Sequence, residues 1–431
     1  MIDRSIGGAI DSSLDRMLHS IDPVIAGILN RAIDGKDIEV EEACELFECS
    51  GRDEVDAMVM VADMLRRTRV GDHVTYVVNR NINFTNVCIK RCGFCAFSRD
   101  FREDEGYLLP VEEIVRRAEE AYRLGATEVC IQAGLMPKMD GMLYIDICRA
   151  IKRAIPDMHI HAFSPEEIKY GALRAGMSVE EYLKALKDAG LGSIPGTAAE
   201  ILVQEVRDTI SPGRIKVRDW VSIVKMAHRL GIPSTSTIMY GHVESSMHKA
   251  MHLALIRDIQ RETHGFTEFV PLSFVYREAP MYRYGLVKGV RAGPSRDEVL
   301  KMHSIARIML NNHIPNIQVS WVKEGLDMCR VLLNAGANDM GGTLINESIS
   351  TAAGAMNGQM LRPREIRALI RGIGRVPVQR DTLYRRLRVF DGKEEHHQDP
   401  LDTVEDTSIF GSYHELIRLD RFKYKRSHPY S

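Results

Sequence analysis

The sequence lacks an excess of charge of either sign. Its 57 Lys and Arg residues nearly balance its 59 Asp and Glu residues, which gives a formal net charge of −2 at pH 7. A protein that binds nucleic acid over a broad surface carries a basic excess or a basic stripe, so this balance argues against that class. Residues 422–426 do combine aromatic and basic side chains, which fits a solvated tail or a local nucleic-acid patch.

Long apolar runs are also missing. A helix that crosses a bilayer needs about 20 predominantly apolar residues, and residues 1–8 lack the apolar core of a signal peptide. We therefore expect a soluble, cytoplasmic protein without a membrane partner. Hydrophobic residues make up 45% of the 431 positions, which suffices for one large barrel with additions or for two or three ordinary domains.

Cysteine is scarce, and its distribution is uneven. Five of the eight cysteines are dispersed, namely Cys44, Cys49, Cys130, Cys148 and Cys329. Dispersed cysteines are typical of reduced core residues, and nothing else indicates an oxidising compartment. The other three, Cys88, Cys92 and Cys95, form a C-x3-C-x2-C pattern.

Three clustered thiolates are natural ligands for an iron–sulfur cluster. A 4Fe–4S cluster held by three cysteines keeps one iron without a protein ligand, and an open metal position is where a substrate binds. A zinc site usually has a fourth Cys or His nearby in the sequence, whereas Cys130, His159 and His161 lie well downstream. The upstream pair, Cys44 and Cys49, fits no zinc spacing. An open cluster is therefore favoured over zinc.

Strand-like segments alternate with helical periodicity along most of the chain. We expect strands at residues 74–78, 127–132, 158–163, 191–194, 232–239, 268–274, 317–321 and 342–345. Helices that end at Gly125, Gly190 and Gly231 lead into three of them. This alternation predicts a parallel sheet, and eight units match a (β/α)8 TIM-type barrel of the α/β class. Because the last two strands have the weakest pattern, a shorter, open six-unit barrel is the alternative.

The pattern divides the chain into four parts. Residues 1–70 form an N-terminal helical segment, and residues 71–350 form the barrel. Residues 351–391 form a C-terminal helical segment packed on the barrel, and residues 392–431 form a polar linker and tail. The cysteine loop follows the first strand, which places it at the end of the barrel where catalytic residues collect.

Small or polar residues follow the next three strands. Ala133 and Gly134 would let the backbone approach a ligand, or they form an ordinary tight turn. Ser164 ends the third strand, behind His159 and His161, whose shared face favours structural or substrate-shaping roles over metal binding. After the fourth strand, Glu200 could accept hydrogen bonds from a ligand or stabilise a helix dipole. Weaker candidates at later strand ends are Thr235, Thr237, Tyr240, His242, Ser273, Trp321 and residues 338–343.

The cysteine pattern resembles the signature of the radical S-adenosylmethionine (SAM) superfamily. The resemblance implies a 4Fe–4S cluster whose open iron holds the amino and carboxylate groups of SAM. It places Phe94 near the adenine, Ala133 and Gly134 near the methionine amino group, and Ser164 near the ribose or carboxylate. Glu200 would bind ribose hydroxyls or the amino group. This chain departs from the usual glycine-rich turn in having Ala133 first and no acid after Gly134.

Longer stretches resemble one family within that superfamily. Residues 79–88, 91–97, 193–202, 239–244 and 266–274 look like the tyrosine-using subunit of FO synthase, a 5-amino-6-(D-ribitylamino)uracil–L-tyrosine 4-hydroxyphenyl transferase. The resemblance covers residues 24–385. The Gly-Thr-Ala-Ala-Glu form of residues 196–200 distinguishes this family from sister enzymes of the futalosine menaquinone pathway, which are the alternative.

The resemblance implies a reaction and its partners. The enzyme would cleave L-tyrosine, release 2-iminoacetate and join the 4-hydroxybenzyl group to the ribityl uracil in the biosynthesis of the deazaflavin FO (coenzyme F0). It would work with the second FO synthase subunit and an electron donor, and with neither nucleic acid nor a membrane. The resemblance assigns no catalytic residue. The rival from another class is a zinc- or cluster-binding structural or nucleic-acid module.

Overall fold

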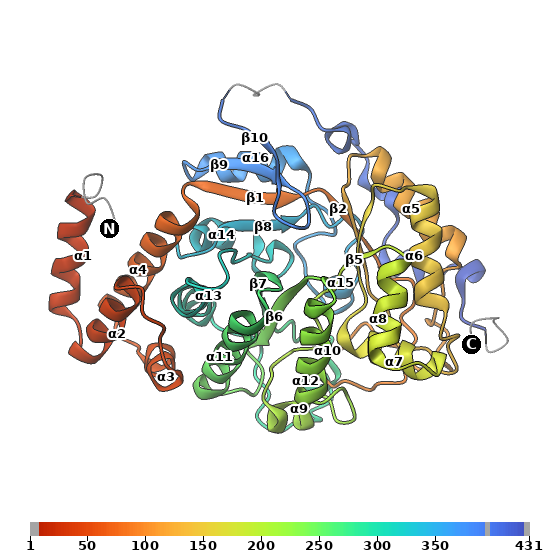
Figure 1. Ribbon diagram of the computed structural model, residues 1–431, viewed down its shortest axis with the longest axis horizontal. Helices are drawn as coiled ribbons and strands as arrows, with labels where there is room; N and C mark the ends of the chain where they lie inside the picture. The colour runs from red at the N-terminus through yellow and green to blue at the C-terminus, as the bar shows by residue number, and fades with distance from the viewer. Residues whose placement is uncertain (1–7, 393–396, 426–431) are drawn as a thin grey trace.

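The computed structural model describes residues 8–392 and 397–425. Figure 1 shows a ring of strands surrounded by helices, with the first four helices at one side and the C-terminal residues at the other. Those first helices are α1 (Gly8–Ser20), α2 (Pro23–Ile33), α3 (Val40–Glu48) and α4 (Arg52–Val70). Helix α3 packs on α11 and α13, and α4 packs on α13. The N-terminal helices therefore extend the helical layer outside the barrel.

The barrel begins with one strand interrupted at Val78. Its halves are β1 (His73–Val77) and β2 (Asn79–Ile82), and the strands that follow are β3 (Glu128–Ile131), β4 (His159–Ala162), β5 (Leu191–Ser193), β6 (Ser234–Tyr240), β7 (Phe266–Ser273) and β8 (Asp339–Gly342). The helices between them are α5 (Val111–Arg123), α6 (Leu143–Ala154), α7 (Pro165–Ala175), α8 (Val179–Asp188), α9 (Gln204–Ile210), α10 (Val217–Arg229), α11 (Ser246–Thr263), α12 (Pro280–Arg283), α13 (Arg296–Leu310) and α14 (Trp321–Leu333).

Parallel pairing runs around the whole ring. One sheet has the order β2-β3-β4-β5, another pairs β6 with β7, and a third pairs β8 with β1. Single parallel bridges join these sheets, from Ile194 to Ser234, from Phe269 to Ile317 and from Gln318 to Asp339. Because β8 pairs in parallel with β1, the ring returns to its first strand. The (β/α)8 barrel is thus confirmed, and the six-unit alternative is wrong.

The last two barrel strands differ from the expected ranges. Residues 317–321 alternate like a strand, but only Ile317 and Gln318 make bridges, and α14 already begins at Trp321. The Trp321 indole is buried and donates to the Gly342 carbonyl oxygen at 2.9 Å, which fixes the start of that helix. The eighth strand lies at Asp339–Gly342 rather than at residues 342–345, with Ile345 adding a bridge to Arg80.

The expectation that residues 351–391 are helical is wrong for their second half. After α15 (Ile349–Ala352) and α16 (Pro363–Gly372), the chain forms β9 (Val376–Arg380) and β10 (Arg386–Val389). Strand β9 runs parallel to β1, and β10 pairs with β9 in antiparallel orientation. The sequence pattern did not predict this hairpin, because its residues are basic and their carboxylate partners lie elsewhere in the chain.

The polar linker and tail expected at residues 392–431 is also wrong for the described part of that range. Short helical turns there comprise η1 (Pro400–Thr403), η2 (Thr407–Phe410), α17 (Tyr413–Leu416) and η3 (Asp420–Phe422). Phe410, Tyr413 and Phe422 are buried in the main core, and the Leu108 amide donates to the Phe422 carbonyl oxygen at 2.8 Å. Residues 393–396 and 426–431, like residues 1–7 of the N-terminal segment, lie outside the described residues.

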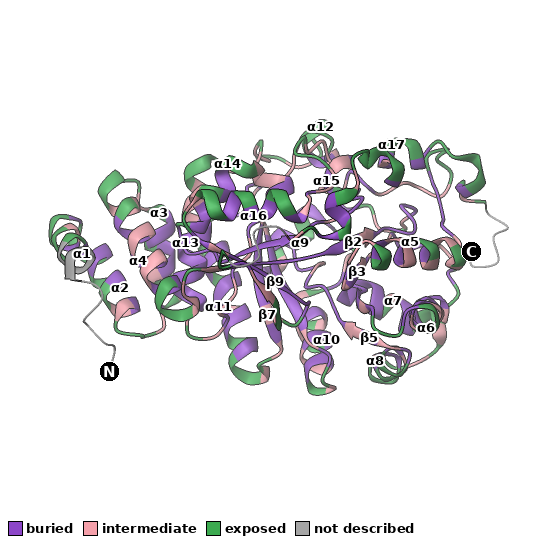
Figure 2. Ribbon diagram, turned by 90° about the horizontal axis from the view of Figure 1, so that it is seen from above, coloured by how far each residue is buried: buried purple, intermediate pink, exposed green. Residues whose placement is uncertain are grey.

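Burial follows the layers of the fold. In Figure 2 the strands and the inner faces of the surrounding helices are buried, whereas the outward helix faces are exposed. Among the described residues, no helix has both the length and the apolar character needed to cross a bilayer.

Candidate radical SAM site

A cavity of about 410 Å³ lies inside the barrel. Its wall contains all eight residues that the sequence nominated for the cluster and SAM: Cys88, Cys92, Phe94, Cys95, Ala133, Gly134, Ser164 and Glu200. Of the later candidates, Thr235, Thr237 and Ser273 also line it, together with Gly341 and Gly342. Chain segments far apart in the sequence thus contribute to one interior site.

The three cysteines of the loop after β2 face this cavity from one side. Cys88 accepts a hydrogen bond from the Lys90 amide at 3.4 Å, and Cys92 accepts one from Arg214 Nη1 at 3.1 Å. Burial raises the pKa of both thiols, to about 12 for Cys92, where the Arg214 charge acts in the opposite direction. A metal that binds these sulfurs must displace their protons, and Arg214 favours the thiolate form.

The donor set fits a cluster better than a single ion. Across residues 8–392 and 397–425, no three His, Cys, Asp or Glu side chains converge to hold one metal ion. A mononuclear zinc site needs ligand sulfurs about 2.3 Å from one point. A cubane presents a different iron to each cysteine, so its ligands stand farther apart. Cys88, Cys92 and Cys95 all lie on one loop and line the cavity, so each could bind one iron of such a cluster.

Arg214 contacts three of the predicted site residues, although it was not predicted to belong to the site. Besides Cys92, its guanidinium contacts Glu200 Oε1 at 3.2 Å and lies 5.4 Å from the centre of the Phe94 ring. Its pKa is held well above the usual value by the Glu200, Cys92 and Glu166 charges, against the opposing effect of burial. The residue lies on the loop between α9 and α10, where no motif marks it.

Glu200 is held by two arginines. Arg214 contacts one carboxylate oxygen, and Arg207 Nη1 contacts the other at 3.0 Å. The backbone at Glu200 has φ of 41°, and Ala198 has φ of 61°, both in the left-handed region that few non-glycine residues adopt. Since α9 begins only at Gln204, Glu200 is not in the first turn of a helix. The helix-dipole alternative therefore does not account for this carboxylate.

Ser164 and Ala133 are linked through Glu167. Ser164 caps α7, and its amide and hydroxyl donate to Glu167 Oε2 at 2.7 and 2.6 Å. The Ala133 amide donates to the other oxygen, Oε1, at 2.9 Å. Burial raises the pKa of Glu167 to about 7. The Ser-x-x-Glu capping box at residues 164–167 is a sequence signal that could have found Glu167.

Gly134 allows close contact between two backbone segments, the turn after β3 and the start of the cysteine loop. A Cβ added there would lie 2.3 Å from the Val87 carbonyl oxygen, a separation that no ordinary contact allows. The Gly134 amide donates to the Thr85 carbonyl oxygen at 2.9 Å, and the Ile89 amide donates to the Leu135 carbonyl oxygen at 2.8 Å. The turn after β3 therefore supports the cysteine loop directly.

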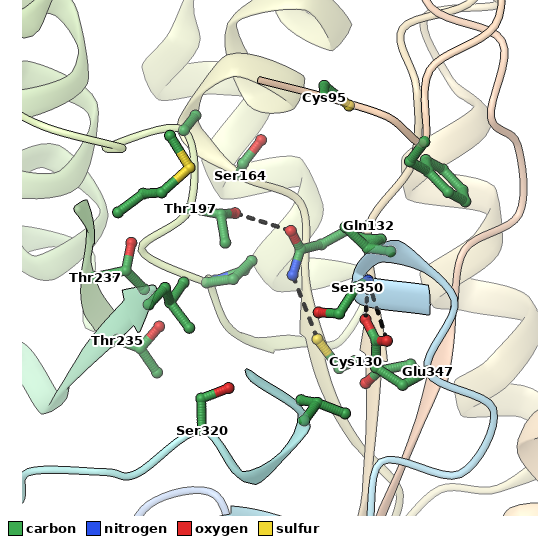
Figure 3. Close-up of a pocket in the computed structure, with 18 of the residues that line it drawn as sticks. Cys95, Cys130, Gln132, Ser164, Thr197, Thr235, Thr237, Ser320, Glu347 and Ser350 are labelled. Carbon is green, nitrogen blue, oxygen red and sulfur yellow. Dashed lines mark hydrogen bonds between the residues drawn. The ribbon is translucent and has the colours of Figure 1, made fainter. Parts of the chain in front are cut away.

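Neutral polar side chains line the cavity away from the cysteines. Figure 3 shows Thr197 donating to Gln132, and Gln132 donating to Cys130, with Thr235 and Thr237 on the other side of the cavity from Ser350 and Glu347. The first of these hydrogen bonds spans 2.9 Å.

His161 also lies in the cavity wall. Its Nδ1 lies 2.7 Å from Ser193 Oγ, and burial lowers the pKa of this histidine to about 4, so it is neutral near pH 7. A structural role for this histidine agrees with these contacts.

Charged side chains at the amino-terminal end of the strands form the opposite end of the cavity. Arg380, from β9, pairs with Asp339 and with Glu268, at 3.5 Å from the latter. Thr382 donates to Glu128 at 2.7 Å, and Tyr384 donates to Glu268. Burial raises the pKa of Glu268 to about 7. The β9–β10 hairpin thus contributes side chains to the site that the sequence pattern did not indicate.

Two family models match successive parts of the chain. Residues 82–254 match the model of the radical SAM superfamily, and residues 263–391 match that of the CofH/MqnC C-terminal region. A Methanothermobacter thermautotrophicus protein named 5-amino-6-(D-ribitylamino)uracil–L-tyrosine 4-hydroxyphenyl transferase is 49% identical over 84% of this chain and 97% of its own length. A Methanocaldococcus jannaschii protein of the same name is 50% identical over 82% and 98%. The chain belongs to this transferase family.

Three further proteins are similar to this chain, one in sequence and two in fold. The FO synthase of Nocardia farcinica is 50% identical over 78% of this chain, but this match covers only 38% of that longer protein. Among solved structures, the FeFe-hydrogenase maturase HydG from Carboxydothermus hydrogenoformans has a TM-score of 0.64 at 18% identity, covering 88% of this chain and 86% of its own. Methylornithine synthase (PylB) has a TM-score of 0.61 at 19% identity, covering 80% and 95%. These two structures share the barrel fold with this radical SAM transferase.

Proposed function

We propose that this enzyme cleaves L-tyrosine and transfers its 4-hydroxybenzyl group to 5-amino-6-(D-ribitylamino)uracil, releasing 2-iminoacetate, in the biosynthesis of the deazaflavin FO. The observation that carries the proposal is the 49–50% identity, over more than four-fifths of the chain, to proteins named for this transfer. An interior cavity lined by thiols, charged groups and hydroxyls supports it.

Cys88, Cys92 and Cys95 would hold a 4Fe–4S cluster, and SAM would lie beside it. Together the two cofactors would supply a carbon-centred radical that abstracts a hydrogen atom from the substrate. Phe94 offers a flat apolar face for the adenine. The buried guanidinium of Arg214 could bind the carboxylate of SAM. The ion pair between Arg214 and Glu200 fixes the orientation of the guanidinium.

The barrel wall has two tasks in this reaction. It encloses the reacting groups, which keeps water and stray hydrogen donors away from a radical. It also supplies neutral hydrogen-bonding groups, from Gln132, Thr197, Thr235 and Thr237, that suit ribityl hydroxyls and the amides of a pyrimidine. Both substrates must occupy the same cavity for the benzyl fragment to reach the uracil.

The proposal includes two protein partners. A depression at the cysteine loop is lined by four basic residues, Lys90, Arg91, Arg99 and Arg102, and by two acidic ones, Asp100 and Glu103. Its excess of basic side chains would receive an electron-donor protein with an acidic surface. The other half of FO synthesis would come from a separate subunit. The Nocardia FO synthase supports this assignment, because it is a much longer chain that contains a region similar to this one.

Anaerobic incubation with SAM, a reductant and L-tyrosine, with and without the ribityl uracil, tests the proposal. Ring-labelled tyrosine should appear in an adduct with the uracil, and carboxyl-labelled tyrosine should appear in glyoxylate, formed by hydrolysis of 2-iminoacetate. An adduct that keeps the tyrosine carboxylate would contradict the proposed bond cleavage. Turnover of a futalosine-type substrate alone would favour the menaquinone-pathway alternative.

A further inference from the structure

Four cationic side chains line the cavity, and one of them differs from the rest. Lys90 lies 3.3 Å from Glu166, Arg214 lies 3.2 Å from Glu200, and Arg380 lies 2.6 Å from Asp339. Lys323 has no carboxylate within 4.0 Å among the described residues. Its ammonium donates to Ser350 Oγ at 3.3 Å, a long contact that leaves two of its three protons for other acceptors.

The position of Lys323 is fixed by its surroundings. It lies in the first turn of α14, beside Trp321, whose indole is bonded to the Gly342 carbonyl oxygen. The carbonyl oxygen of Val322 accepts a hydrogen bond from Asn357 Nδ2 at 3.1 Å. The chain segment that carries the ammonium is thus hydrogen-bonded to the last residue of β8 and to Asn357, beyond α15.

The two carboxylates whose charges act on Lys323 are hydrogen-bonded to other groups. Glu347 accepts hydrogen bonds from the Ser350 amide at 2.9 and 3.1 Å, and Glu324 accepts one from Ser273 Oγ. Their charges still favour the ammonium form of Lys323, although burial is the larger effect and lowers its pKa. Lys323 is only partly buried at the cavity wall, and among the described residues no carboxylate contacts its ammonium. The Lys323 ammonium in the cavity wall can therefore bind an anionic group of a ligand.

The substrates of the proposed reaction identify that group. The ribityl uracil carries hydroxyls and amides but no anionic group, so it offers no charge to pair with an ammonium. Tyrosine brings one carboxylate. Figure 3 shows Ser350, the hydrogen-bond partner of Lys323, facing the cavity across from Thr235 and Thr237. A carboxylate placed against Ser350 would satisfy the ammonium and leave the phenol ring within the cavity.

We propose that Lys323, together with the Ser350 hydroxyl, binds the α-carboxylate of the L-tyrosine substrate. This assignment rests on the proposed function. It makes Lys323 the residue that distinguishes an amino acid from the corresponding amine. It also gives the carboxylate-bearing fragment a site of its own after the side chain has been cleaved.

Equilibrium binding to the anaerobic, cluster-loaded enzyme with SAM tests the assignment. The probes are L-tyrosine and tyramine, which lacks the carboxylate. In the wild-type enzyme tyramine should bind about 10- to 100-fold more weakly than L-tyrosine, as expected for losing one charge-assisted hydrogen-bonded pair. Lys323→Met should weaken L-tyrosine binding by the same factor and leave tyramine binding unchanged, because the two deletions remove the same interaction.

Two further variants complete the design. Lys323→Arg should retain most of the L-tyrosine affinity, since it keeps the charge. Lys184→Met, on the outer helix α8 where Lys184 pairs with Glu180, should match the wild type. The iron content and the thermal unfolding of each variant show whether it is folded. The comparison of L-tyrosine with tyramine on the wild-type enzyme does not depend on the folding of any variant.

Several outcomes overturn the assignment. Equal binding of L-tyrosine and tyramine by the wild type would do so, as would a Lys323→Met enzyme with wild-type affinity for L-tyrosine. A loss of ribityl uracil binding in that variant, with tyrosine binding intact, would assign Lys323 to the other substrate. Failure of the proposed function is seen separately, as a wild-type enzyme that neither binds nor consumes L-tyrosine.

Discussion

The guanidinium of Arg380 donates from Nε and Nη2 to the two carboxylate oxygens of Asp339, at 2.6 and 2.9 Å. Arg380 ends β9 and Asp339 begins β8, and both strands flank β1. The pair is buried, with exposed fractions of 3% and 0% for the two side chains. It joins the C-terminal hairpin to the barrel beside the cavity that Arg380 lines.

We expect Arg380→Met to destabilise the protein strongly. The substitution leaves Asp339 and Glu268 as buried carboxylates without their cation, and removing one partner of a buried pair costs about 3–5 kcal/mol. Urea-induced unfolding of the cluster-loaded protein measures the change. Arg385→Met is the control, because Arg385 pairs with Asp381 from a largely exposed position. It should cost less than about 1 kcal/mol, and equal losses in the two variants would contradict the structural role of Arg380.

Local patterns were sufficient to predict the barrel and the cluster loop. The strand-helix alternation, glycine helix stops and close cysteine spacing all lie within short windows, so each could be read without knowing the fold. The strand at residues 317–321 misled because Val319 and Trp321 alternate like strand residues, although the chain turns into a helix at Trp321. A pattern of period two cannot show where the backbone leaves the sheet.

Pairings over long sequence distances could not be predicted. Arg214 contacts Cys92, which lies 122 positions earlier, and Arg380 contacts Asp339 across 41. An isolated arginine in a loop carries no periodic signal, and the strand β9 looks too basic to be buried unless its carboxylate partner is known. The Ser164–Glu167 capping box, in contrast, lies within four residues and can be predicted from the sequence; the Ser164 hydroxyl donates to Glu167 and also lines the cavity.

Replacing any one of Cys88, Cys92 and Cys95 by Ser should abolish SAM cleavage, because a cluster with three ligands has none to spare. The protein should stay soluble, since the loop makes its own backbone contacts. Iron and sulfide content and 5′-deoxyadenosine formation are the measurements. Cys130→Ser is the matched control, as Cys130 lines the same cavity but contacts Gln132. A Cys92→Ser enzyme that still forms 5′-deoxyadenosine would remove Cys92 from the cluster.

Gly134→Ala should displace the cysteine loop. The new Cβ would lie 2.3 Å from the Val87 carbonyl oxygen, so one of the two backbones must move. Overpacking of this kind typically costs about 1–3 kcal/mol, and here it should also lower the iron retained after anaerobic reconstitution. Gly27→Ala is the control, because no heavy atom lies within 4 Å of its added Cβ. Full iron retention in Gly134→Ala would show that the close approach is unimportant.

Glu200→Ala should weaken SAM binding by about 1–3 kcal/mol, the usual cost of losing a charged hydrogen-bonding partner. Part of this loss acts through Arg214, which Glu200 orients. Arg214→Met should therefore also weaken SAM binding, and the double variant should lose less than the sum of the two. Isothermal titration with SAM measures all three. Glu205→Gln, which affects only the exposed pair with His248, is the control. If the losses of SAM-binding free energy in the two single variants add up in the double variant, Glu200 and Arg214 act independently on SAM.

The stability of the enzyme should fall as the pH drops below 6.5, and His252 should account for part of the slope. This buried histidine accepts a hydrogen bond from the Leu202 amide at its Nδ1, at 2.9 Å, so the ring must be neutral there. Burial lowers its pKa from 6.5 to about 3. A folded-state pKa below the unfolded value stabilises the protein fully above pH 6.5, and this contribution is lost as the pH falls toward 3.

The expected effect can be measured on one variant. His252→Asn keeps an acceptor for the Leu202 amide but cannot take up a proton. The free energy of unfolding of this variant should therefore fall less steeply between pH 6.5 and 5, by up to about 1.4 kcal/mol per pH unit. His264→Asn is the control, because His264 is exposed and ends α11 in a left-handed conformation that Asn also adopts. Identical pH slopes in His252→Asn and the wild type would mean that protonation of His252 does not limit stability. A reduced slope would link acid sensitivity to Leu202, two residues beyond Glu200 on the loop between β5 and α9.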